Sequence, residues 1–138
     1  GQWRGGLGVR TEIVLGSDRT QLVTFGDGDV KPAFGLFGGR EGTLNFIELR
    51  KPDGTVYRPT SKDLVTGLPV ETVFVQEAGG GGGFGDPHRR PAEMVAREVR
   101  DGITSAEAAR RDYGVCLRAG TFDVDEPATA KLRPGTRD

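Results

Sequence analysis

The chain of 138 residues is long enough for one domain or for one piece of a larger subunit. Its 19 basic and 20 acidic residues give a net charge of −1, without the basic stripe that grips a nucleic-acid backbone, and it has no apolar run of membrane-spanning length. These features argue against nucleic acid and membrane as main partners. With 35% hydrophobic residues and 23 glycines, the expected core is thin and bounded by loops.

Residues 1–78 predict a small antiparallel β structure of about five strands. Aliphatic and β-branched residues dominate Val9–Leu15, and Gly16–Asp18 supplies turn residues before a second strand at Arg19–Phe25. We therefore expect these two neighbouring strands to pair with each other.

A long glycine-rich loop follows at residues 31–43, and it carries the apolar side chains of Phe34, Leu36 and Phe37. Loops normally run over the surface and are polar, so apolar residues in this one indicate that it packs against something.

Three further strands complete the β part. Leu44–Arg50 is followed by a strong turn at Lys51–Gly54, where Pro and Gly suit the central turn positions, so Thr55–Arg58 is expected to return beside it. The alternating segment Glu71–Gln76 then leads directly into the glycine run.

Helical periodicity begins after the glycine run. Pro91 suits the first position of a helix that places Val95 and Val99 on one face and stops at Gly102. Thr104 has capping-box spacing to Glu107, which predicts a second helix that ends at Gly114.

Short strands are expected at Val115–Leu117 and Thr121–Val124, whereas the tail from Pro127 has no assigned element. The fold class is therefore α+β, with a β-rich part at 1–78, a glycine-rich junction at 79–90, and a helical hairpin with its tail at 91–138.

Gly80, Gly82 and Gly85 satisfy a G-x-G-x-x-G spacing after an expected strand. A dinucleotide site needs a helix to start within this motif, and here Asp86 and Pro87 intervene before a helix near Pro91. We therefore favour a junction over a nucleotide fingerprint.

The remaining single residues indicate no self-contained catalytic set. His88 is the one histidine and is expected to be a solvated loop residue, although with Asp86 it would form half of a metal or proton-transfer site. Cys116 cannot form an internal disulfide, and we expect it to be a buried, inert thiol.

Because no signal peptide opens the sequence, the cytoplasm is the expected compartment. The pairs Arg89-Arg90 and Arg110-Arg111 are expected on solvated helix faces, with phosphate binding as the minority reading.

Several stretches, taken together and in order, resemble the C-terminal region of the B subunit in the hydantoinase B/5-oxoprolinase family. The stretches that carry this resemblance are Trp3–Arg10, Phe34–Gly39, Ser61-Lys62, Gly80–Pro87, Val99–Thr104 and Ala108–Val115. The chain differs from the family pattern in Phe84, where Tyr is frequent, and in a glycine run that is one residue longer.

The resemblance implies an ATP-dependent, multi-subunit enzyme that hydrolyses cyclic amides such as N-methylhydantoin or 5-oxoproline, or a related carboxylase of acetone- or acetophenone-like ketones. It implies an A-type subunit that binds ATP and phosphorylates the substrate carbonyl oxygen, and an N-terminal part of the B-type subunit that holds the metal-binding residues. ATP with Mg and a divalent metal are thus expected for the whole hetero-oligomer. We expect the present segment to bind no cofactor and to be inactive alone.

No catalytic residue or metal ligand is assigned to this segment. The candidate site is a loop whose backbone amides face substrate or phosphate, formed by Gly80, Gly81, Gly82, Gly83, Gly85 and Asp86. The alternative is a non-catalytic assembly module whose β face and Phe34–Phe37 loop dock onto other subunits.

Overall fold

The computed structural model describes residues 1–135 and confirms the α+β fold, with antiparallel sheets and short helices. The chain forms two compact units. The β unit contains residues 5–34 and 41–82, and the helical unit contains residues 1–4, 35–40 and the chain from Gly83 onward. The glycine run is therefore divided, because Gly79–Gly82 belong to the β unit and the glycines that follow belong to the helical unit.

The larger sheet of the β unit is antiparallel and has four strands. Its order is β1 (Val9–Val14), β6 (Val73–Ala78), β3 (Phe46–Arg50) and β4 (Val56–Tyr57). The predicted return of the chain after the Lys51–Gly54 turn is confirmed, since β4 pairs with β3.

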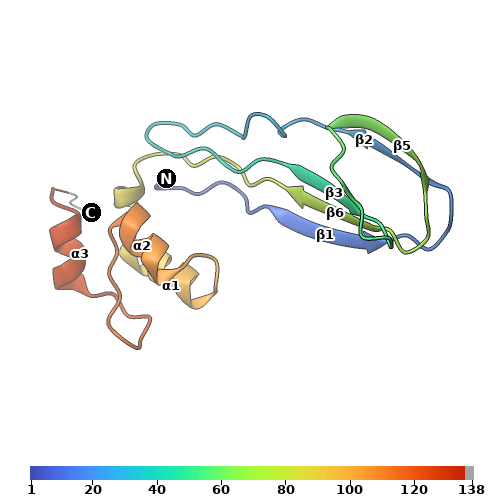
Figure 1. Ribbon diagram of the computed structural model, residues 1–138. Helices are drawn as coiled ribbons and strands as arrows, with labels where there is room; N and C mark the ends of the chain where they lie inside the picture. The colour runs from blue at the N-terminus through green and yellow to red at the C-terminus, as the bar shows by residue number, and fades with distance from the viewer. Residues whose placement is uncertain (136–138) are drawn as a thin grey trace. The chain divides into compact units, whose positions relative to one another are not determined.

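A two-stranded ribbon of β2 (Thr20–Phe25) and β5 (Lys62–Leu68) lies over this sheet (Figure 1). The predicted pairing of the first two strands is wrong, because β1 pairs with β6 and β2 pairs with β5. At the end of β1 the backbone of Leu15 exchanges hydrogen bonds with Glu71 and Thr72, so the chain leaves toward the second layer instead of forming a tight hairpin. Because the strands are divided between two layers, the apolar face of one layer can pack against that of the other.

The interior of the β unit is small. Its fully buried side chains are Leu49, Leu68, Thr72 and Val75, each at most 1% exposed. Thr72 is satisfied by a 2.8 Å hydrogen bond from its hydroxyl to the carbonyl of Pro69. A thin core of this kind agrees with the low hydrophobic content of the sequence.

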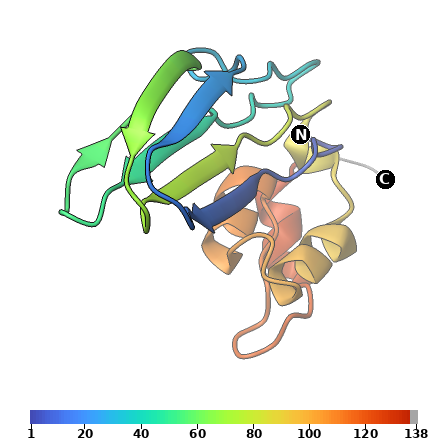
Figure 2. The ribbon, with the colours of Figure 1, turned by 90° about the vertical axis from the view of Figure 1, so that its right-hand side faces the viewer.

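Up to Gly135, the last described residue, the helical unit contains four short helices, of which α1 to α3 are grouped together in Figure 2. They are η1 (Pro87–Arg89), α1 (Ala92–Arg100), α2 (Ala106–Tyr113) and α3 (Glu126–Leu132). Within residues 1–135, none of the helices has the length and apolar character needed to cross a membrane.

Caps account for most of the helix boundaries. The start of α1 immediately after Pro91 and the end of α2 at Gly114, which has φ 64°, agree with prediction. The predicted Thr104 cap is wrong, because the hydroxyl of Ser105 accepts the hydrogen bond from the amide of Ala108. Ser105 has the extended backbone that an N-cap requires.

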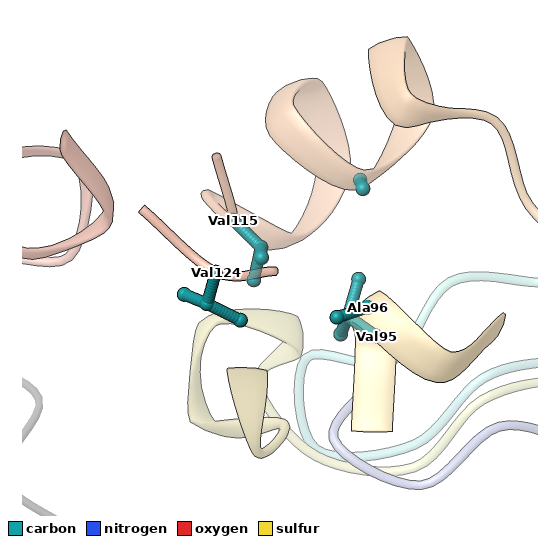
Figure 3. Packing of buried hydrophobic residues seen from close by; sticks show 5 residues of the cluster. Val95, Ala96, Val115 and Val124 are labelled. Atoms are coloured by element: carbon teal, nitrogen blue, oxygen red, sulfur yellow. The ribbon is translucent and has the colours of Figure 1, made fainter. Parts of the chain in front are cut away.

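One apolar cluster packs α1 and α2 against the segment that follows α2, and Figure 3 shows its side chains converging. Its buried members are Val95, Ala96, Ala109, Val115 and Val124. The two short strands predicted around this cluster are reduced to a single antiparallel bridge between Leu117 and Val124.

Candidate functional site

The first half of the glycine run, Gly79–Gly82, is hydrogen-bonded to other segments of the β unit through the amides of Gly79, Gly80 and Gly81. The Gly79 amide donates to Asn45 Oδ1 at 2.7 Å, and the Gly80 amide donates to Thr43 Oγ1 at 2.9 Å. The Gly81 amide donates to the carbonyl oxygen of Gly6, also at 2.9 Å. This segment therefore lies between two other glycine-containing segments and is hydrogen-bonded to both.

Glycine is required here by close packing of backbone against backbone. A Cβ added to Gly42 would lie 1.9 Å from the carbonyl oxygen of Gly80, and one added to Gly79 would lie 2.0 Å from that of Thr43. On the other side, a Cβ on Gly5 would lie 2.4 Å from the carbonyl carbon of Gly81. We call this arrangement of residues 5–8, 42–43 and 79–82 the glycine spine.

The second half of the run makes the same kind of contact within the helical unit. The Gly83 amide donates to the carbonyl of Arg40 at 2.8 Å, and a Cβ on Gly39 would lie 2.0 Å from the carbonyl oxygen of Gly83. Gly85 has φ 76°, a conformation that favours glycine, and its amide donates to the carbonyl of Leu36 at 2.9 Å.

Asp86 ends the run as a helix cap. Its Oδ1 accepts a 2.9 Å hydrogen bond from the amide of His88 at the start of η1. His88 is half-buried, and Asp86 meets its backbone amide through this bond. Among residues 1–135, no three His, Cys, Asp or Glu side chains gather where they could hold a metal ion.

Of the six predicted site residues, Gly80–Gly82 lie in the β unit, whereas Gly83, Gly85 and Asp86 lie in the helical unit. The amides of Gly80, Gly81, Gly83 and Gly85 donate to acceptors of the chain itself, so contact with a phosphate would compete with those bonds. The assignment of this stretch to substrate or phosphate stays a prediction.

A buried charge cluster in the helical unit was missed by the sequence analysis. Arg90 is 5% exposed, so its predicted place on a solvated face is wrong. It donates to Glu98 Oε1 at 2.5 Å and to the carbonyl of Gln2 at 2.7 Å, and Arg4 approaches the same Glu98 oxygen at 3.2 Å. Glu98 follows Val95 by three residues on the apolar face of α1, and a charge at that spacing is the signal that could have revealed a buried partner.

Arg110 and Arg111 are exposed, as predicted, and Cys116 is buried with a free thiol.

A second charged cluster covers one face of the larger sheet. The buried carboxylate of Glu48 accepts hydrogen bonds from Arg50 at 2.7 Å and from Arg58 at 3.1 Å. These bonds, that from Arg50 first, hold the pKa of Glu48 below its ordinary value. Glu12 on β1, two strands away in the sheet, lies 3.8 Å from Arg50, and its pKa is lowered chiefly by its hydrogen bond from Arg10. Complete pairing of this kind is typical of a structural network.

A cavity of about 260 Å³ lies between the ribbon and the sheet of the β unit. Leu22, Phe25, Ile47 and Phe74 supply apolar walls, and Gln76 is among its polar lining residues. Asp29 and Ser61 also line it, and the Ser61 amide donates to Asp29 Oδ2 at 3.3 Å.

The chain resembles known proteins along almost its entire length. The family model described as hydantoinase B/oxoprolinase matches residues 1–87. The caprolactamase subunit beta of Pseudomonas jessenii is 37% identical over 133 residues, which cover 94% of this chain and 22% of that protein.

Solved structures agree with this match. The ATP-dependent caprolactamase from Pseudomonas jessenii aligns with a TM-score of 0.70 at 32% identity, over 96% of this chain and 23% of that one. A nucleotide-free acetone carboxylase aligns with a TM-score of 0.62 at 19% identity, over 91% of this chain and 24% of that one, and shares the fold. The chain thus spans between a fifth and a quarter of the length of these relatives. Because the family model matches more than half of its residues, the chain belongs to the hydantoinase B/oxoprolinase family.

Proposed function

We propose that this chain is the C-terminal part of the B-type subunit of an ATP-dependent enzyme that opens a cyclic amide by hydrolysis. The observation that carries the proposal is the 37% identity with a caprolactamase beta subunit over 94% of the chain. The more distant likeness to an acetone carboxylase, at 19% identity, gives less support to the ketone carboxylase alternative.

An ATP requirement has a clear chemical reason in such a reaction. Resonance makes an amide carbonyl a poor electrophile, and transfer of a phosphoryl group to its oxygen would make it reactive toward water. In the proposed complex an A-type subunit performs that transfer, and the remainder of the B-type subunit supplies the divalent metal site. The complex is proposed to work in the cytoplasm, where the free thiol of Cys116 would stay reduced.

The role proposed for the present chain is to build the scaffold around that chemistry. Its glycine amides donate to acceptors of the chain itself, and its charged clusters are paired internally. These features favour a packing role, with no reacting group supplied by residues 1–135.

The experiment is an activity assay on the complete A-type and B-type complex with a panel of caprolactam, hydantoin and 5-oxoproline. We expect ring opening of at least one cyclic amide that depends on ATP and Mg²⁺, and no turnover by the 138-residue chain alone. Bicarbonate-dependent consumption of acetone, without ring opening of any amide, would overturn the hydrolase proposal in favour of the carboxylase. Robust turnover by the isolated chain would overturn the scaffold role.

A further inference from the structure

Four large apolar side chains of the helical unit lie together at the surface. They are Trp3, Leu36, Phe37 and Phe84, with exposed fractions of 51%, 47%, 77% and 46%. We call them the surface cluster. A soluble protein exposes single apolar residues often, but an assembled group of this kind indicates an interaction site.

Backbone hydrogen bonds hold the surface cluster in place. Trp3 and Phe84 exchange two bonds, from the Trp3 amide at 2.9 Å and from the Phe84 amide at 2.8 Å, and Leu36 forms a parallel bridge on the other side of Phe84. Residues directly opposite in such bridges place their side chains on the same face. Hydrogen bonds between backbones thus join the three separate stretches of chain that carry the cluster.

Phe37 completes the cluster in a strained conformation. Its φ is 50°, in the left-handed region that a bulky side chain rarely adopts. Its ring meets that of Phe84 edge to face, with centroids 5.1 Å apart and an interplanar angle of 63°. Even with this contact the Phe37 side chain stays 77% exposed, and strained residues concentrate at functional surfaces.

The length of the relatives favours one occupant for this surface. The relatives match nearly all of this chain with only 22% to 24% of their own length, so in them this region is joined to a much larger polypeptide. Permanent interfaces are more apolar than transient ones, and their cores are enriched in aromatic residues. The uncharged, aromatic composition of the surface cluster therefore suits a permanent contact better than a reversible one.

We propose that the surface cluster is the contact through which this region packs onto the remainder of its own B-type polypeptide. The inference rests on the proposed function, because it requires that such a remainder exists.

The test is hydroxyl-radical labelling of the complete B-type subunit, first without and then with the A-type subunit, read out residue by residue by mass spectrometry. Phe122 is the internal control, since it lies in the same unit outside the cluster and is 52% exposed against 77% for Phe37. If both rings were free, Phe37 would be labelled faster, by a factor of about 1.5 when labelling follows exposed area. We expect Phe37 to be labelled roughly ten times more slowly than Phe122 in the B-type subunit alone, as burial in an interface core requires.

Labelling of Phe37 at or above the rate of Phe122 in both samples would overturn the proposal. Protection that is present only after the A-type subunit is added would also overturn it, because the occupant would then be the partner subunit. If the proposed function were wrong but this contact were right, the complete complex would show no ATP-dependent turnover, and Phe37 would still be protected from labelling.

Discussion

Substitution of Gly42 by Ala tests whether the glycine spine is held together by backbone contact. The new Cβ would lie 1.9 Å from the carbonyl oxygen of Gly80 and 2.9 Å from its carbonyl carbon, whereas carbon and oxygen atoms normally stay about 3.3 Å apart or more. The two segments must separate by roughly 1 Å or more to relieve this overlap. That shift would break or stretch the bonds from Gly42 to Ala33 and from Gly80 to Thr43, which are now 2.8 and 2.9 Å long.

The expected loss can be worked out from these contacts. Overpacking costs about 1–3 kcal/mol, and each weakened hydrogen bond adds about 1 kcal/mol, so G42A should lose roughly 3–5 kcal/mol of unfolding free energy. Gly6 provides the matched control, because a Cβ there meets nothing within 4 Å and its φ lies outside the left-handed region. G6A should therefore stay within about 0.5 kcal/mol of the parent chain or be slightly more stable.

Urea unfolding of the two variants and the parent chain, followed by circular dichroism, measures this difference. A G42A variant within about 1 kcal/mol of G6A would refute the close-packing argument. The same variants in the complete enzyme test the predicted phosphate-facing role. A raised KM for ATP in G42A at unchanged stability would favour a site at the glycine run, and lost stability without a specific change in KM would favour packing.

Two further predictions concern one side chain in each unit. Because hydrogen bonds from Arg50 and Arg58 hold the pKa of Glu48 below its ordinary value, its ion pairs stabilise the fold above that ordinary value, and the contribution is lost as pH falls through the lowered pKa. E48Q should therefore lose less stability than the parent between about pH 7 and about pH 3 in urea titrations, and equal losses would contradict the role of this carboxylate. V115A should lower the unfolding free energy by about 1.5–3 kcal/mol, because Val115 is fully buried in the helical cluster. Thermal unfolding measures the effect, and V30A is the exposed control, so equal melting temperatures for the two variants would contradict the assigned core.

Features specified by neighbouring residues could be predicted from the sequence. The Lys51–Gly54 turn, the start of α1 after Pro91 and the end of α2 at Gly114 each depend on the backbone preference of one or two residues. The Thr104 cap failed because Ser105, the next residue, offers the same hydroxyl and sits in the extended conformation.

Features specified by distant residues could not be predicted in this way. The partner of β1 is β6, at the other end of the β unit, and alternation within a strand says which face is apolar but nothing about the neighbouring strand. The strand Lys62–Leu68 was missed, because Asp63 and Gly67 interrupt its pattern, and α3 was missed because it is short and starts beside a proline.

At the candidate site, too, local features could be predicted from the sequence and contacts between distant residues could not. The sequence identified the glycine run as the marker of the family, and the comparisons confirm that family. The sequence could not reveal why Gly5 and Gly42 must be glycine. A side chain at either position would overlap a backbone carbonyl group of the glycine run, which is tens of residues away in the sequence.

The pairing of β1 with β6 has a consequence for synthesis on the ribosome. Val14 is opposite Val73, so β1 has no hydrogen-bonding neighbour in its sheet until 59 more residues have been made. Loops of that length close slowly, and an unpaired strand edge is prone to association with other chains. We expect nascent chains that stop before the glycine run to remain unfolded in this region, and to be the species that a chaperone binds.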